Sequence, residues 1–243
     1  MQIFVILPAA GLGTRMAHKT AAKQFLSLGG VPIVIRSVQA FLALPEIAAV
    51  TLAVRSPELP RVREMVAEHL PGMGSRVNVV EGGETRQDSV GRGLASLDAA
   101  TDDDIILVHD AVRPLIEANY IRQVIAAAER HGAAILGTPA LDTIKVVERT
   151  ADGALITSTI PRERVVLAQT PQGFKAKLLR RAFAEADADG FAGTDEASLA
   201  ERAGIPVVVV PGSTRNFKIT QPGDLELAEF YFSSSNSPNT PSS

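Results

Sequence analysis

The chain of 243 residues has a formal net charge of −3 at pH 7, with 46% hydrophobic and 21% charged residues. This composition is that of an ordinary globular protein, and its slightly acidic balance argues against nucleic acid as a partner, because surfaces that bind nucleic acid are usually basic. The chain contains no cysteine, which excludes disulfides, cysteine-ligated zinc and a thiol nucleophile, and fits a cytoplasmic location. No apolar run approaches about 18 residues, so we expect neither a membrane-spanning helix nor a membrane partner.

Apolar, β-branched runs alternate with amphipathic stretches of helical length along most of the chain. The expected strands are residues 3–7, 47–54, 76–80, 104–109, 133–138 and 205–210. The expected helices are residues 31–43, 57–70, 87–99, 119–131, 175–187, 194–203 and 222–232. This alternation predicts an α/β fold, a Rossmann-like three-layer sandwich whose sheet is mainly parallel. Because ligands of such sheets bind at the carboxyl ends of the strands, residues 8–15, 81–89 and 109–114 should surround one crevice.

Residues 142–169 interrupt the alternation, and within them a hairpin arm is expected at about 142–165. Two β-branched runs there flank Asp152-Gly153, which is a strong signal for a β-hairpin. An isolated hairpin is at best marginally stable in water, so we expect this protruding arm to pack on a second subunit. The chain from residue 1 to 232 is expected to form a single domain. The tail at 233–243 contains only Ser, Asn, Pro and Thr and should be disordered.

The first strand leads into a loop of small residues with two glycines, Gly11 and Gly13, and cations follow. Arg15 and Lys23 both precede the first acidic residue of the chain, which is Glu46. Bare backbone amides in such a turn can form a concavity for phosphate oxygens, and glycine lets a ligand come close. We interpret this stretch as a site for a polyanion. A plain strand-to-helix turn with incidental surface cations is the structural alternative.

Three phosphate-binding patterns compete for this loop. The Walker A pattern needs Gly-Lys-Ser/Thr, but His18 precedes Lys19-Thr20. The dinucleotide fingerprint needs a third small residue where Met16 stands. Arg55, which follows the second long strand, could still suit the phosphate of NADP, so an NADP-binding reductase is kept as a distant alternative. A non-catalytic nucleotide sensor is another.

The third pattern, Gly11-x-Gly13-x-Arg15 with Lys23 eight residues later, resembles the signature of nucleotidyltransferases. Further matches run in order through nearly the whole chain. They are Pro8-Ala9-Ala10, Lys23-Gln24, Gly82-Gly83-Glu84-x-Arg86-x-Asp88-Ser89-Val90, His109-Asp110-Ala111-x-Arg113-Pro114, Asp142-Thr143-x-Lys145, Thr170-Pro171-Gln172, Thr194-Asp195-Glu196-Ala197 and Asn216-x-Lys218-x-Thr220. The set resembles the 2-C-methyl-D-erythritol 4-phosphate cytidylyltransferase family of the non-mevalonate isoprenoid pathway. Two positions depart from it: Ala22 replaces the usual proline, and Glu84 a common aspartate.

The resemblance implies transfer of CMP from CTP to 2-C-methyl-D-erythritol 4-phosphate with release of pyrophosphate, and Mg²⁺ as the cofactor. A phosphate monoester has a second pKa of about 6, so the acceptor is largely dianionic at neutral pH and needs no general base. The reaction instead needs alignment and neutralisation of charge across the α- and β-phosphates, which cations supply. A ribitol 5-phosphate cytidylyltransferase shares most of these motifs and is the main alternative.

The resemblance also implies roles for individual residues. The catalytic residues are Arg15, Lys23 and Lys218. The CTP contacts are Ala9, Ala10, Gly11, Gly13, Gly83, Glu84, Ser89 and Asp110. The contacts with the acceptor, a polyol phosphate, are Asp110, Arg113, Thr143, Arg162, Thr170, Thr194 and Lys218. Asp110, at the end of a strand beside the triphosphate, is also the expected Mg²⁺ ligand, directly or through water.

By the same resemblance, the arm is exchanged between the subunits of a homodimer, so that Thr143 and Arg162 would serve the neighbouring site. Arg162 is placed by counting back from Thr170-Pro171-Gln172, and Arg164 stays open as an alternative.

Several of these residues also have plainer interpretations. Lys23 alone could be a solvated helix lysine, and Asp110 a structural partner of Arg113. Thr194-Asp195 has the pattern of a helix N-cap.

Overall fold

The computed structural model describes residues 1–11 and 23–236 of the chain. Residues 12–22 and 237–243 lie outside the described residues, and with them two residues predicted to act on CTP, Gly13 and Arg15. Within the two described ranges, no helix combines the length and apolar character that crossing a membrane requires.

Seven strands form one sheet in the order β11-β7-β10-β6-β1-β4-β5. Their bounds are β1 (Ile3–Pro8), β4 (Ile47–Val54), β5 (Val77–Glu81), β6 (Ile105–Val108), β7 (Ala133–Pro139), β10 (Val166–Lys175) and β11 (Val208–Pro211). Strand β1 pairs in parallel with β4 and β6, β4 with β5, and β7 with β11. Strand β10 runs antiparallel to both of its neighbours, β6 and β7. The predicted mainly parallel α/β sheet is confirmed.

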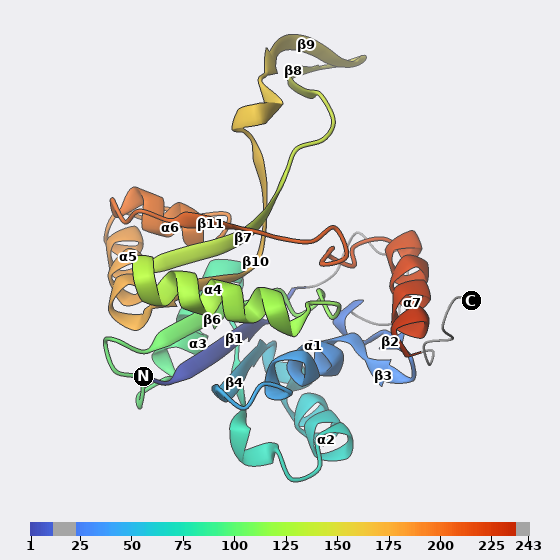
Figure 1. Cartoon of the computed structure of the whole chain (residues 1–243), viewed down its shortest axis with the longest axis vertical. Helices are drawn as coiled ribbons and strands as arrows, with labels where there is room; N and C mark the ends of the chain where they lie inside the picture. Colours follow the sequence, from blue (N-terminus) through green and yellow to red (C-terminus); the bar gives the residue numbers. More distant parts are fainter. Residues whose placement is uncertain (12–22, 237–243) are drawn as a thin grey trace, which may run out of the picture.

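Helices cover both faces of this sheet (Figure 1). One face carries α1 (Ile33–Leu42), α2 (Leu59–His69) and α4 (Ala118–His131). The other carries α3 (Arg86–Ala95), α5 (Ala176–Ala188) and α6 (Glu196–Arg202). Successive residues of a strand point to opposite faces, so Val5 and Leu7 join the first apolar cluster, while Phe4 and Ile6 join the second. A strand that is apolar at every position is therefore buried on both sides, as the sequence pattern predicted.

Strand β10 lies near the middle of the sheet and was not expected from the sequence. It contains Pro171 and Gly173, and proline is normally confined to edge strands or bulges because it has no amide hydrogen. The pairing of β10 with β7 shifts register between Ala168 and Gln172, so Pro171 sits in the irregularity. The interruption of the ladder therefore accommodates a residue that is unusual in a central strand.

Strands β8 (Ile144–Thr150) and β9 (Gly153–Ile160) form the predicted hairpin as a two-stranded antiparallel sheet of their own. This arm stands well away from the body, at the top of Figure 1. Gly153 has a φ of +144°, a conformation that side chains disfavour. Leu155 and Ile156 are each 64% exposed, so the arm leaves apolar side chains uncovered in the single chain.

The remaining elements are short, except for the last helix. They are the 3-10 helices η1 (Lys23–Phe25), η2 (Ser56–Glu58), η3 (Gly74–Arg76) and η4 (Arg162–Arg164), and the paired strands β2 (Ser27–Leu28) and β3 (Val31–Pro32). Helix α7 (Pro222–Asn236) packs beside β2, and its Ala228 joins an apolar cluster with Leu28.

Helix α7 corrects the predicted start of the tail. It continues to Asn236, so the boundary expected between 232 and 233 falls too early. Extending a helix that its apolar residues have already nucleated costs little per residue, and the hydroxyl of Ser234 donates to the carbonyl of Phe230 at 2.8 Å. The expected disorder of the rest of the tail lies outside the described residues.

We expect Gly93→Ala to destabilise the protein, because α3 lies too close to β1 at this point. A Cβ on Gly93 would come within 2.7 Å of Cγ2 of Ile6, and such overpacking costs about 1–3 kcal/mol. Gly91 on the same helix has room, with its nearest contact at 3.5 Å from Phe183, so Gly91→Ala should instead gain up to about 1 kcal/mol of helix propensity. Urea unfolding of both variants measures this difference, and equal stabilities would contradict it.

Candidate active site

A pocket opens where β1, β5 and β6 reach their carboxyl ends. Its lining residues are Pro8, Ala9, Ala10, Gly11, Lys23, Gln24, Glu84, Thr85, Arg86, Ser89, Asp110, Ala111, Val112 and Lys218. Among them, the residues that the sequence predicted for the site are Ala9, Ala10, Gly11, Lys23, Glu84, Ser89, Asp110 and Lys218. The three segments predicted to surround one crevice thus meet there, as far as the described residues show. The assigned roles themselves stay predictions.

The start of the glycine loop is held by backbone and side-chain hydrogen bonds. The amide of Ala9 donates to the carbonyl of Ala53 at 2.8 Å, which carries the pairing of β1 with β4 one residue past the end of β1. The buried side chain of Gln24 donates from Nε2 to the carbonyls of Ala9 and Gly11, at 2.9 and 3.3 Å. Because Gln24 follows Lys23 in the chain, these bonds fix η1 against the loop and bring Lys23 to the pocket wall.

The loop after β5 has a fixed backbone because a capping box begins α3. The hydroxyl of Thr85 accepts from the amide of Asp88, and the carboxylate of Asp88 accepts from the amide of Thr85, both at 3.0 Å. Glu84, the residue before this N-cap, lines the pocket together with Thr85. A Cβ on Gly83 would lie 2.2 Å from that of Asp88, so this turn requires glycine. The amide of Gly83 donates to Oγ of Ser89 at 3.1 Å.

The carboxylate of Asp110 contacts three cations. Oδ2 lies 3.1 Å from Nε of Arg113 and 3.2 Å from Nζ of Lys218, and Oδ1 lies 3.3 Å from Nε of Arg86. Burial alone would raise the pKa of Asp110, but Lys218, Arg86 and Arg113 outweigh it and hold that pKa well below its usual range. Asp110 therefore stays ionised at neutral pH. Arg113 is also bonded to the carbonyl of Asn216 at 2.7 Å.

Lys218 reaches the pocket from an irregular segment between β11 and α7. The amide of Ile219 donates to the carbonyl of Val112 at 2.9 Å, which fastens this segment to the loop after β6. The side chain of Lys218 is 38% exposed, so its ammonium group combines a contact with Asp110 and access to the pocket.

A chain of buried hydrogen bonds supports Asp110 through its backbone. Nε2 of His109 lies 3.0 Å from the carbonyl of Arg113, and because a carbonyl only accepts, that nitrogen carries the proton. Burial lowers the pKa of His109 to about 4, so the ring is neutral and its Nδ1 accepts from the hydroxyl of Thr170 at 3.0 Å. The same hydroxyl accepts from the amide of Asp110 at 3.0 Å. Thr170 is buried beneath the site, and its contact with the acceptor stays a prediction.

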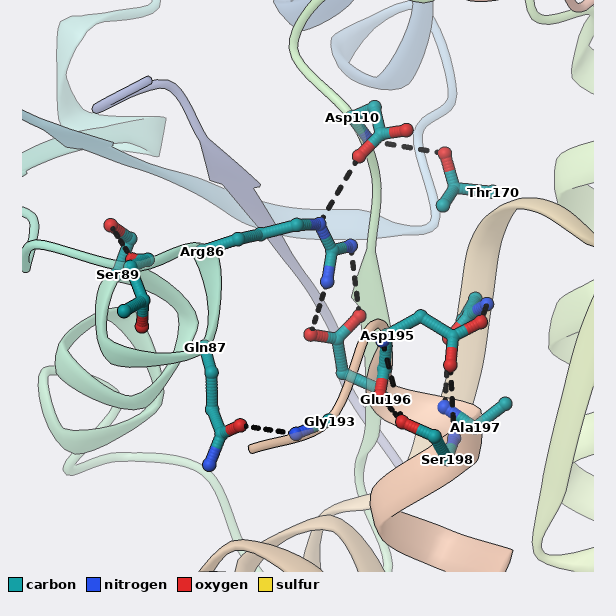
Figure 2. A network of polar contacts seen from close by, with 12 residues as sticks. Arg86, Gln87, Ser89, Asp110, Thr170, Gly193, Asp195, Glu196, Ala197 and Ser198 are labelled. Carbon is teal, nitrogen blue, oxygen red and sulfur yellow. Dashed lines mark hydrogen bonds and ion pairs between the residues drawn. The ribbon is translucent and has the colours of Figure 1, made fainter. Parts of the chain in front are cut away.

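Arg86 and Glu196 belong to motifs noted in the sequence but were given no role there. Nη1 and Nη2 of Arg86 donate to the two carboxylate oxygens of Glu196, at 2.8 and 3.0 Å, while Nε faces Asp110 (Figure 2). Burial would lower the pKa of Arg86, but the carboxylates of Glu196 and Asp110 outweigh it and raise that pKa. Arg86 lines the pocket, and Glu196 is 1% exposed.

Five predicted acceptor residues do not line this pocket in the single chain: Arg113 and Thr170, whose contacts are given above, and Thr194, Thr143 and Arg162. Thr194 is exposed and precedes Asp195, the N-cap of α6, whose Oδ1 accepts from the amide of Ser198 at 2.9 Å. Thr143 is exposed at the base of the arm. Arg162 lies in η4, where Nη1 donates to the carbonyl of Leu141 at 2.6 Å. The choice between Arg162 and Arg164 stays open, because both belong to η4.

A metal site made by the protein alone was not found in the part of the chain that the structure describes. No three side chains of His, Asp or Glu come together there in a way that could hold an ion. The predicted metal ligand, Asp110, is a single carboxylate on the pocket wall.

Comparison with known proteins identifies a family that this chain resembles. The family model described as 2-C-methyl-D-erythritol 4-phosphate cytidylyltransferase (IspD) matches residues 3–234. A curated relative of that name from Acidobacterium capsulatum is 61% identical, and the match covers 95% of this chain and 97% of the relative. A second, from Solibacter usitatus, is 48% identical, and the match covers 95% of this chain and 96% of the relative. The solved structure of the enzyme from Francisella tularensis superposes with a TM-score of 0.79 at 31% identity and covers 95% of this chain and 99% of its own. That of the enzyme from Thermus thermophilus superposes with a TM-score of 0.75 at 35% identity and covers 95% of this chain and 98% of its own.

Thr170→Val should destabilise the protein, since valine keeps the shape of threonine but has no hydroxyl. The amide of Asp110 and Nδ1 of His109 would then both be buried without a partner, and an unsatisfied buried group costs about 1–3 kcal/mol. Thr170→Ser keeps the hydroxyl and serves as the control. Chemical denaturation should rank the serine variant above the valine variant, and the opposite order would contradict this account of the hydrogen bonds.

Proposed function

Because the chain belongs to the 2-C-methyl-D-erythritol 4-phosphate cytidylyltransferase family, we propose that its pocket transfers CMP from CTP to 2-C-methyl-D-erythritol 4-phosphate. The products are 4-diphosphocytidyl-2-C-methyl-D-erythritol and pyrophosphate, a step in the synthesis of isoprenoid precursors. The observation that carries the proposal is the meeting of Lys23, Lys218 and Asp110 in one pocket beside the glycine loop, in a chain 61% identical to a relative of that name.

The chemistry requires no proton transfer. An oxygen of the dianionic acceptor phosphate attacks the α-phosphorus of CTP, and the bond from that phosphorus to the oxygen bridging the α- and β-phosphates breaks, so that pyrophosphate leaves. Charge develops on the phosphoryl oxygens, and fixed cations that face them stabilise it. Lys23 and Lys218 line the pocket and suit this role. Arg15, outside the described residues, is proposed as a third cation.

The nucleoside is proposed to bind on the side of the loop that follows β5. Gly83 brings backbone close to the pocket without a side chain, and its amide and the hydroxyl of Ser89 are joined by a hydrogen bond. Glu84 lines the pocket beside them. A loop whose backbone is fixed by a capping box suits recognition of a base edge, because no conformational freedom is lost there on binding.

The residues fit Mg²⁺ that arrives with the nucleotide. This ion is usually held by one or two carboxylates together with substrate phosphates and water, and Asp110 offers one carboxylate on the pocket wall. Both oxygens of Asp110 also face cations, so the carboxylate suits a contact through water as well as a direct one. When bound, Mg²⁺ would neutralise phosphate charge.

The arm is proposed to form the contact of a homodimer. It carries exposed apolar side chains, among them Val147, Leu155 and Ile156, and such surfaces in a soluble chain mark interaction sites. Thr143 and Arg162 lie at the base of the arm rather than in the pocket, which is compatible with their acting on the acceptor in a partner's site. A cytoplasmic location and the absence of a nucleic-acid partner complete the proposal, supported by the lack of cysteine and the net charge of −3.

The alternatives are weaker. Arg55, the residue that favoured NADP, lies 3.1 Å from Glu58 in an ion pair and does not line the pocket. The relatives quoted above are named for methylerythritol phosphate, not for ribitol phosphate.

Pyrophosphate release tests the substrate assignment. With CTP and Mg²⁺, the protein should release pyrophosphate when 2-C-methyl-D-erythritol 4-phosphate is added, and ribitol 5-phosphate should give at most a small fraction of that rate. Chelation of divalent ions with EDTA should abolish turnover, and added Mg²⁺ should restore it. Turnover with ribitol 5-phosphate alone would overturn the assignment of the acceptor.

Light scattering coupled to size exclusion tests the arm. The unaltered chain should elute at twice the mass of one chain. Replacing both Leu155 and Ile156 by Ser should shift it towards the monomer and lower turnover, because these side chains are buried only if a partner covers them. Replacing Leu227 and Phe230, exposed apolar residues of α7, is the control and should leave the mass unchanged. A monomeric parent chain, or an arm variant that stays dimeric, would argue against the proposed interface.

A further inference from the structure

Arg86 occupies a central place in the site that neither the fold nor the proposed chemistry explains. It is the first residue of α3, Asp110 follows β6, and Glu196 is the first residue of α6. Its guanidinium group lies between the two carboxylates and bonds to both (Figure 2). Three segments that are distant in the sequence are thus joined by one side chain at the pocket wall.

The contact with Glu196 fixes the orientation of the guanidinium. Both oxygens of that carboxylate are engaged, and the paired geometry of an arginine fork leaves one arrangement of the planar group. Glu196 is 1% exposed, and a buried carboxylate is tolerated only with a partner of opposite charge. The anchoring carboxylate therefore keeps Arg86 in place, and Nε is then directed at Oδ1 of Asp110.

The contact with Asp110 divides the two oxygens of that carboxylate between different cations. Oδ1 faces Arg86, whereas Oδ2 faces Arg113 and Lys218. If Arg86 were absent, the carboxylate could turn and offer both oxygens to Lys218, which would bind the ammonium group more tightly to the wall. With Arg86 present, Lys218 meets a single oxygen at 3.2 Å and keeps its other hydrogens for the pocket.

We propose that Arg86, anchored by Glu196, is a positioning residue for cytidylyl transfer that holds Asp110 so that Lys218 remains available to the phosphates. This inference rests on the proposed function, because it assumes that Lys218 acts on the reacting phosphates. It predicts an effect of Arg86 on the rate of transfer that goes beyond its effect on folding.

The neighbouring Gln87 provides a matched control. Its side chain ties α3 to the segment before α6, much as Arg86 ties α3 to α6 itself: Nε2 donates to the carbonyl of Phe191 at 3.1 Å, and Oε1 accepts from the amide of Gly193 at 2.9 Å. It does not contact Asp110 in the structure. A role limited to joining α3 and α6 would therefore be shared by both residues, whereas an action through Asp110 belongs to Arg86 alone.

The experiment compares four variants with the parent chain, which is first shown to release pyrophosphate from CTP. Arg86→Gln leaves Glu196 buried without its cation and should lose stability. The double variant Arg86→Gln with Glu196→Gln removes both charges and should regain stability. Arg86→Lys keeps the charge but not the fork, and Gln87→Ala is the control. Steady-state rates, calorimetric CTP binding and thermal unfolding are measured for each.

The double variant should recover thermal stability without recovering turnover. Its kcat should stay about 10- to 100-fold below that of the parent, comparable to the loss found when a residue that orients a metal ligand is removed. Its dissociation constant for CTP should change far less. Arg86→Lys should also remain slow, while Gln87→Ala should lose stability but keep a kcat close to the parent value.

Two outcomes would overturn the positioning role. One is a double variant whose kcat equals that of the parent, and the other is a Gln87→Ala variant that loses as much kcat as Arg86→Lys. Both leave the proposed function intact, because the parent is active in each. A parent that folds and binds CTP but releases no pyrophosphate with either acceptor would instead overturn the proposed function, and this inference with it.

Discussion

The balance of charge around Asp110 is the constraint on which the site depends. A carboxylate taken out of water is costly unless charges and hydrogen bonds replace the solvent, and here Arg86, Arg113 and Lys218 supply the charges. Each cation comes from a different part of the chain, so the carboxylate acts as a common point at which α3, the loop after β6 and the segment before α7 are joined. Without a carboxylate among them, these cations would repel one another, and the negative charge of Asp110 offsets part of that repulsion. The pocket can then receive a polyanion and still hold its cations close together.

The sheet explains why these groups meet. Parallel strands all end at the same edge, so the turns after β1, β5 and β6 converge there. The antiparallel strand β10 runs between β6 and β7 and brings Thr170 beneath Asp110, where its hydroxyl links the amide of Asp110 to His109. Side chains that would contact phosphates thus rest on a rigid layer of hydrogen bonds. Rigid support of this kind lowers the cost of holding a reactive geometry, because the groups are in place before the ligand arrives.

The sequence predicted most of the architecture, and its failures have physical reasons. The apolar strands and amphipathic helices are local signals, and Ile47–Val54 was even expected with the bounds that β4 has. Strand β10 was missed because Pro171 and Gly173 argue against a central strand unless a bulge is known to be present. In the site, the glycine loop and Asp110 could be placed from neighbouring residues. The pairing of Arg86 with Glu196 joins positions 110 residues apart, and no local pattern reports such a contact. Thr143 and Arg162 lie at the base of the arm rather than in the pocket, so their contact with the acceptor stays a prediction.

The way the arm joins the sheet affects how this fold can change during evolution. Strands β7 and β10 are neighbours, and Pro139 pairs with Val166 at the point where the chain leaves the body and returns to it. Residues 140–165 therefore form a long insertion whose two ends are held together by the pairing of β7 with β10. The entropy lost in closing such a loop grows only slowly with its length. The insertion can therefore change in length or sequence at little cost to the stability of the sheet. The arm is a part of the chain whose apolar surface can diversify while the sheet and helices of the body remain unaltered.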